Sequence, residues 1–209
     1  MVPIGGKPLL AYWLESLVAL GVQDILINTH YLAEQVTAFV NASEFRDRVS
    51  LVYEDDLLHT GGTLLKNKAF FDKAPFFVIH ADNFSCCNYK DFIDAHTKRP
   101  KKTIATMMTF DTQNPQECGV IKKNNQGVMI EFFEKVKHPP SHIANGAVYL
   151  FEHEIFALLE AEKKPVIDIS NDIIPKLLGK INTFHNTQCH IDIGTITNYQ
   201  LACDYARRM

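Results

Sequence analysis

The chain has 209 residues, of which 46% are hydrophobic and 22% are charged, as expected for a globular domain with a sizeable core. Its 21 Lys and Arg residues against 24 Asp and Glu residues give a formal charge of -3 with no basic block, which argues against nucleic acid or a membrane surface as a partner. No apolar run approaches the roughly 20 residues that span a bilayer. The chain start lacks a signal-peptide pattern and the five cysteines lack CxxC spacing, so we expect reduced thiols in a cytoplasmic protein.

The first part of the chain alternates helix and strand patterns. Apolar residues spaced as on one helix face follow Pro8, and Gly21 stands where a helix commonly ends. A buried strand is predicted over 24–28, a second helix from about residue 32, and a second strand over 49–53. The side chains that the second helix would bury are Leu32, Val36, Phe39 and Val40. This alternation predicts a parallel sheet.

The rest of the chain predicts a mixed sheet. A strand ending at Asp82 and a helix over 89–96 are followed by strands over 103–109, 119–123 and 128–134 without long helices between them. The last two are joined by a hairpin-type turn, and the chain continues with a strand over 147–151, a helix capped by Asp168, a strand ending at Asp192 and a terminal helix. We therefore predict an α/β class: one doubly wound, three-layer domain over residues 1–209, with a mostly parallel mixed sheet and a small antiparallel part.

Asp82 and Asp192 are candidate metal ligands. Each follows an apolar run that predicts a buried strand, and α/β sheets bind ligands at the carboxyl ends of their strands. Two carboxylates could hold one divalent cation. An exposed aspartate at such a place more commonly caps a helix or forms a turn. The metal hypothesis requires that residues 110 positions apart come together, which the sequence does not show.

A glycine-bearing segment precedes the strand that ends at Asp82. Gly61 and Gly62 would let the backbone approach a flat or phosphorylated ligand, and Thr63 could cap the following helix. A tight turn explains the same residues equally well.

Two further segments offer polar side chains. Glu134 and Lys135 provide a carboxylate for sugar hydroxyls and an ammonium group for a phosphate, although this dipeptide is common on solvated surfaces. Asn145, followed by Gly146, offers an amide with space beside it, or simply a turn.

The order of these segments carries more information than any one of them. The segments that matter are Gly5–Leu10, Asn28–Leu32, Leu58–Thr63, His80–Asn83, Cys118–Val120, Phe132–Lys135, Ala144–Tyr149 and Asp192–Thr195. Together they resemble the sugar-1-phosphate nucleotidylyltransferases, also called nucleoside-diphosphate-sugar pyrophosphorylases, over essentially all 209 residues. They look most similar to the mannose-1-phosphate guanylyltransferase-like branch.

The resemblance implies an enzyme that joins a sugar 1-phosphate to a nucleoside triphosphate, giving an NDP-sugar and pyrophosphate, with GTP and a hexose or mannose 1-phosphate as the implied pair. Because the attacking phosphate is already ionised, alignment and charge neutralisation would supply the catalysis. The alternative is a non-catalytic relative that binds nucleotide sugars or regulates an enzyme. A plain interaction domain fits so many ordered segments poorly.

The resemblance also implies roles for individual residues. Asp82 and Asp192 would hold Mg²⁺ against the phosphates, and Lys135 would contact the sugar phosphate. The residues that would line the nucleotide and sugar pockets are Gly61, Gly62, Gly119, Glu134 and Asn145. Of these, the paired glycines would lie near the nucleobase, Gly119 would border the sugar pocket, and the last two would hold sugar hydroxyls. His80 stands where the family usually has glycine.

The start of the chain departs from the family. Members open with a strand, a glycine-rich G-x-G-T-R-like loop for the triphosphate and a lysine in a P-K-x-L segment, and this chain begins after them at Val2-Pro3-Ile4. We therefore expect a truncated or a degenerate member whose catalysis is impaired in this form. A missing strand would leave a slot in the sheet, which would favour a homo-oligomer.

Overall fold

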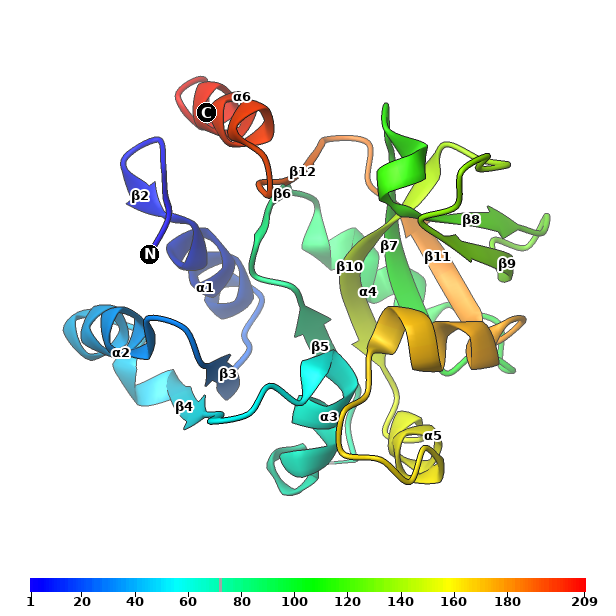
Figure 1. Cartoon of the computed structure of the whole chain (residues 1–209), viewed down its shortest axis with the longest axis horizontal. Helices are drawn as coiled ribbons and strands as arrows, with labels where there is room; N and C mark the ends of the chain where they lie inside the picture. The colour runs from blue at the N-terminus through cyan, green and yellow to red at the C-terminus, as the bar shows by residue number, and fades with distance from the viewer. Residues whose placement is uncertain (72) are drawn as a thin grey trace. The chain divides into compact units, whose positions relative to one another are not determined.

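The computed structural model describes residues 1–71 and 73–209 and divides into two compact units (Figure 1). Unit 1 comprises Met1–Leu57, Ala81–Cys86 and Cys189–Met209, and unit 2 comprises Leu58–His80 and Cys87–Gln188. Both contain helices and strands, with parallel and antiparallel pairings, so the predicted α/β class with a mixed sheet is confirmed. Within the described residues there is no helix with the length and apolar character that crossing a bilayer requires.

Unit 1 contains three pairs of strands and three α-helices. Its strands are β1 (Pro3–Ile4), β2 (Lys7–Pro8), β3 (Ile25–Thr29), β4 (Val49–Tyr53), β6 (Asn83–Cys86) and β12 (Cys189–Asp192). Its helices are α1 (Leu9–Ala19), α2 (Ala33–Ala42), the short η1 (Arg46–Arg48) and α6 (Ile196–Ala206). β3 and β4 pair in parallel, whereas β1 with β2 and β6 with β12 pair antiparallel.

Helix α1 has the predicted form. It begins directly after Pro8, and Gly21 follows its end with a left-handed φ of 86°. The Gly21 N–H donates to the carbonyl of Val18, which closes the last turn. The Trp13 indole N–H donates to the Asn83 carbonyl over 2.8 Å and so joins α1 to β6.

Helix α2 differs from its prediction at the first position. It begins at Ala33, and Leu32 is exposed in a left-handed conformation with φ 53°. Val40 is buried, whereas Val36 and Phe39 are half-buried. The apolar spacing located the helix correctly, but burial of Leu32 was wrong because that residue lies outside the first helical turn.

Unit 2 is built on a six-stranded sheet. Its strands are β5 (Phe76–Ile79), β7 (Ala105–Asp111), β8 (Gly119–Lys123), β9 (Met129–Glu134), β10 (Ile143–Phe151) and β11 (Ile181–His185). The order is β11-β7-β10-β8-β9, and β5 also pairs with β10. Its helices are α3 (His59–Lys66), α4 (Tyr89–Thr97), α5 (Ile155–Ala161) and the short η2 (Lys68–Phe70), η3 (Pro115–Glu117), η4 (Ile169–Ile173) and η5 (Ile174–Leu177).

Side chains alternate between the two faces of this sheet. On β5, Phe76 and Val78 pack into a core cluster with residues of α3, α5 and η4, whereas the ring of Phe77 lies 6.0 Å from that of Phe92 on α4. Phe92 also contacts Phe184 on β11. Helices therefore cover both faces of the sheet in unit 2, as the period of two along a buried strand requires.

The antiparallel share is larger than the sequence predicts. In the described part of the chain, only β3 with β4 and β7 with β11 are parallel. β5 ends at Ile79, three residues before Asp82, and β6 begins at Asn83. Neither β6 nor β11 was predicted from the sequence, because runs of four or five residues with mixed polarity give too little periodicity to distinguish a strand from a loop.

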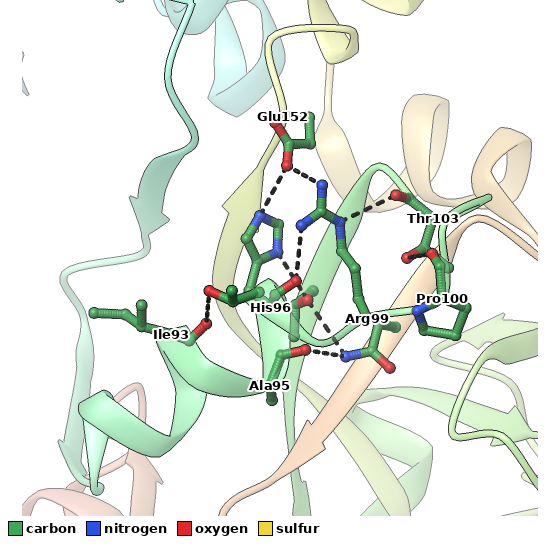
Figure 2. A network of polar contacts seen from close by, with 10 residues as sticks. Ile93, Ala95, His96, Arg99, Pro100, Thr103 and Glu152 are labelled. Atoms are coloured by element: carbon green, nitrogen blue, oxygen red, sulfur yellow. Dashed lines mark hydrogen bonds and ion pairs between the residues drawn. The ribbon is translucent and has the colours of Figure 1, made fainter.

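A buried polar network ties α4 to the sheet of unit 2 (Figure 2). His96, which is 4% exposed, places Nδ1 2.9 Å from the Thr106 hydroxyl and Nε2 3.4 Å from the Glu152 carboxylate. Arg99 forms an ion pair with the same carboxylate and donates to the carbonyls of His96 and Thr103. Burial, and secondarily the Arg99 charge, lowers the pKa of His96 to about 4.

This lowered pKa predicts a loss of stability in mild acid. The unfolded chain binds a proton at His96 near pH 6.5 and the folded chain only near pH 4, so the stability that neutral His96 contributes is complete above pH 6.5 and falls as the pH drops to 4. The loss should be about 3 kcal/mol at most. Urea unfolding should show wild type more stable than His96→Gln at pH 7.5, with a gap that narrows between pH 6.5 and 4. A gap that stays constant would contradict this account.

Candidate functional site

The two candidate metal ligands lie on neighbouring segments of unit 1. Asp192 is the last residue of β12 and stands opposite Asn83, the first residue of β6. The next residue on each side continues the pairing, because the Ile193 N–H donates to the Asp82 carbonyl over 3.2 Å. The structure thus brings together the backbones of two aspartates that are 110 positions apart in the sequence.

Local hydrogen bonds hold both carboxylates. Asn83 donates its side-chain amide to Asp82 Oδ1 over 3.1 Å, and the Gly194 N–H donates to Asp192 Oδ1 over 2.7 Å. Thr195 caps α6 by accepting the Asn198 N–H. The helix cap is therefore Thr195, and Asp192 forms a turn and stays exposed beside Asp82.

The donor chemistry of this pair fits a hard cation. Mg²⁺ prefers oxygen ligands and is commonly held by one or two carboxylates with substrate phosphates and water completing its coordination. Among residues 1–71 and 73–209, His, Cys, Asp and Glu side chains form no cluster of three or more that could enclose a metal by themselves. Asp82 and Asp192 fit an ion that arrives with a phosphate ligand, and their role as ligands stays a prediction.

A second group of candidate residues forms a row across the sheet of unit 2. Glu134 on β9 stands directly opposite Gly119 on β8. Val120 pairs with Ala144 on β10, so the antiparallel register places Asn145 on the other side of Gly119. Residues that are opposite each other point to the same face of a sheet, so Glu134 and Asn145 lie on one face with Gly119 between them.

Gly119 makes room for the Glu134 carboxylate. A Cβ at this position would lie 2.5 Å from Glu134 Oε2 and 2.8 Å from the ring of Phe132. Burial, and secondarily the charge of Asp168, raises the pKa of Glu134, and the neighbouring Lys135 opposes this shift. Lys135 has a left-handed φ of 49°, which redirects the chain directly after β9.

Asn145 lies at an irregularity in β10. Asn145 pairs with Thr109 and Tyr149 with Met107, so β10 advances four residues where β7 advances two. Ala147, within this bulge, has a left-handed φ of 51°. The Asn145 amide accepts the Ala147 N–H over 3.0 Å and donates to the Tyr149 hydroxyl over 2.7 Å.

The paired glycines occupy the first turn of α3 and not a loop. Both Gly61 and Gly62 donate their N–H groups to the Ile167 carbonyl, over 2.8 and 3.1 Å. The helix begins at His59 and has no side-chain cap, so the expected capping role of Thr63 was wrong. Because these amides already have an acceptor, they are not open donors for a phosphate.

Tyr149 is a further residue of this region. It is fully buried, and its hydroxyl accepts the Asn145 side-chain amide over 2.7 Å. Asp168 caps η4 by accepting the Asn171 N–H, as predicted. The sequence contained no signal for the contact between Tyr149 and Asn145, because a tyrosine in an apolar strand is ordinarily a core residue and only the bulge brings it to Asn145.

The chain is similar to known nucleotidyl transferases in sequence. The sequence model of a family described as nucleotidyl transferase matches residues 1–207. The mannose-1-phosphate guanylyltransferase catalytic subunit beta of Drosophila pseudoobscura pseudoobscura is 25% identical over 85% of this chain and 47% of its own length. The glucose-1-phosphate thymidylyltransferase of Streptomyces griseus is 28% identical over 83% of this chain and 49% of its own length. The chain spans about half the length of these curated relatives.

Solved structures share the fold. The crystal structure of HddC from Yersinia pseudotuberculosis superimposes with a TM-score of 0.82 and 24% sequence identity, covering 99% of this chain and 88% of that chain. At this identity the likeness establishes the fold alone.

The packing around the paired glycines makes a prediction about stability. A Cβ on Gly62 would lie 2.2 Å from the Pro165 carbonyl oxygen, a backbone atom that cannot move without disturbing the bonds to Ile167. We expect Gly62→Ala to lower the free energy of unfolding by about 3 kcal/mol, measured by urea titration. Gly21→Ala is the control, because a Cβ there meets no atom within 4 Å and only the left-handed φ should cost about 1 kcal/mol. Equal losses in the two variants would contradict the packing argument.

Proposed function

Because the chain belongs to the nucleotidyl transferase family, a family of enzymes, we propose that it is a sugar-1-phosphate nucleotidylyltransferase. The proposed reaction joins a sugar 1-phosphate to a nucleoside triphosphate. An oxygen of the sugar phosphate forms a bond to the α-phosphorus, the bond between the α- and β-phosphates breaks, and pyrophosphate leaves with the electron pair. The observation that supports this most is the row of Glu134, Gly119 and Asn145, which offers a carboxylate and an amide on one sheet face of a chain matched from residue 1 to 207.

The proposed roles follow from the chemistry of each group. Glu134 accepts hydrogen bonds from sugar hydroxyls, Asn145 holds the same sugar, and Gly119 leaves the space in which they act. The exposed Lys135 ammonium contacts the sugar phosphate. These residues belong to unit 2, and we treat residues 1–209 as one nucleotidyltransferase domain.

Unit 1 carries the proposed metal ligands. Asp82 and Asp192 would hold Mg²⁺, which when bound neutralises charge on the phosphates. We keep Gly61 and Gly62 as the proposed neighbours of the nucleobase, in contact through their Cα atoms, because their N–H groups are bonded to Ile167. GTP with a hexose or mannose 1-phosphate is the pair we propose to test first, supported by the Drosophila relative, although the Streptomyces relative is named for thymidylyl transfer. We propose that the protein acts in the cytoplasm.

Pyrophosphate release tests the reaction and the aspartates together. Each nucleoside triphosphate should be supplied with a panel of sugar 1-phosphates and Mg²⁺, and we expect release with at least one pair. Asp82→Asn and Asp192→Asn should each lower the rate by about a hundredfold or more, because each removes a charged ligand of the proposed ion. Asp204→Asn, which changes an exposed ion pair with Arg207, should leave the rate unchanged. Binding of nucleotide and sugar without any release would favour the non-catalytic alternative.

Gly119→Ala tests the proposed sugar site at the row of Glu134, Gly119 and Asn145. The new Cβ would meet the flexible end of Glu134 and the Phe132 ring, so the carboxylate must move while the backbone need not. We expect the KM for the sugar 1-phosphate to rise about tenfold, with a smaller change in the KM for the nucleotide. Parallel urea titrations should show the variant folded at the assay temperature. A rise in the nucleotide KM alone would show that Gly119 lies elsewhere than in the sugar site.

A further inference from the structure

The bulge in β10 creates a contact that a regular strand could not make. Residues four apart on a strand are separated by about 13 Å, yet Asn145 Nδ2 lies 2.7 Å from Tyr149 Oη. The two extra residues of β10 relative to β7 shorten this separation. The left-handed Ala147 in the bulge donates its N–H to Asn145 and its carbonyl accepts the His80 N–H over 3.1 Å.

The donors and acceptors along this contact have only one consistent arrangement. The Ala147 N–H can only donate, so the oxygen of the Asn145 amide must face it. The amide nitrogen then faces Tyr149, and because this nitrogen can only donate, the Tyr149 oxygen accepts. The Tyr149 hydroxyl therefore accepts from Asn145 through a lone pair and keeps its own hydrogen. An Asn145 amide turned over would place N–H groups against the Ala147 N–H.

The Tyr149 hydroxyl is suited to stay neutral. Its side chain is fully buried, and burial raises the pKa of Tyr149 far above its ordinary value. Its ring stacks on Phe151 with centroids 5.1 Å apart and meets the edge of His80 at 6.4 Å. These contacts fix the ring, and the ring fixes the hydroxyl that holds Asn145.

We propose that Tyr149 is a positioning residue: it holds the Asn145 amide with its oxygen on the Ala147 N–H and its nitrogen on the Tyr149 hydroxyl, so that the second N–H of Asn145 and the Glu134 carboxylate bind one hydroxyl of the sugar. The Cα atoms of Glu134 and Asn145 are about 10 Å apart across two strand spacings, and the Glu134 carboxylate leans over Gly119. A deoxy sugar would leave a carboxylate and an N–H unpaired. This inference rests on the proposed function.

Sugar selectivity distinguishes the proposed positioning role of Tyr149 from a merely structural role. Tyr149→Phe keeps the ring and removes the hydroxyl, so we expect the KM for the sugar 1-phosphate to rise about tenfold while the KM for the nucleotide stays the same. The preference for the parent sugar over its deoxy analogue should fall by a similar factor.

Tyr89→Phe is the matched control, because Tyr89 is a buried tyrosine at the start of α4. It should leave sugar KM and selectivity unchanged. Asn145→Asp tests whether the side chain at this position must donate a hydrogen bond to the sugar. A carboxylate cannot donate and would add a second negative charge beside Glu134, so this variant should lower sugar affinity further than Tyr149→Phe does. An active wild type whose sugar KM and selectivity are unaffected by Tyr149→Phe would overturn the inference.

A double-mutant cycle measures the coupling between Asn145 and Tyr149 without any assay of activity. Urea unfolding of Asn145→Ala, Tyr149→Phe and the double variant should show a combined loss smaller than the sum of the single losses. Additive losses of unfolding free energy would overturn the proposed coupling between Asn145 and Tyr149, whether or not the protein is active. Coupled losses in a wild type that binds and turns over no sugar 1-phosphate would instead overturn the proposed function and, with it, the selectivity, leaving the hydrogen-bonded chain as a structural feature.

Discussion

The register of β10 is the constraint on which unit 2 depends. This strand pairs with β7 along both its halves and with β8 and β5 along one half each, and its register against β7 shifts at a bulge between Asn145 and Tyr149. Backbone N–H and C=O groups in a buried sheet must be paired, so the bulge is held from several sides. The same bulge brings the side chains of Asn145 and Tyr149 together. The strand pairing therefore also positions a residue of the candidate sugar site.

The two groups of candidate residues are positioned by different means. In unit 1 the aspartates depend on the pairing of two short strands, whose ends bring Asp82 beside Asp192. In unit 2 the row of Glu134, Gly119 and Asn145 depends on register across three strands, where a shift of one residue would turn every side chain to the other face. Both arrangements hold functional groups on paired backbone, which limits their movement more than a loop would.

Much of the fold was accessible from local patterns. The helix at α1 followed from its apolar spacing and from Gly21, and the hairpin of β8 and β9 followed from the turn at 124–127. The burial expected for Leu32 and the capping role expected for Thr63 were wrong, because the start of a helix depends on which groups accept hydrogen bonds from its first N–H groups. In α3 the acceptor for Gly61 and Gly62 is the carbonyl of Ile167, which lies far away in the sequence. The strands β6 and β11 are too short to carry a periodic signal.

The α/β class, most of the elements and the family could be read from the amino-acid sequence, because apolar periodicity and ordered motifs are properties of the chain. The sequence also supplied the residue types that the proposed chemistry needs. Three facts could be learned only from the folded chain: Asp82 and Asp192 lie on adjacent backbone segments, the N–H groups of Gly61 and Gly62 donate to Ile167, and Tyr149 accepts a hydrogen bond from Asn145. These facts depend on pairing and packing between segments that are far apart in the chain. The free energy of such a contact depends on both segments together, so the local pattern of either segment alone does not predict it.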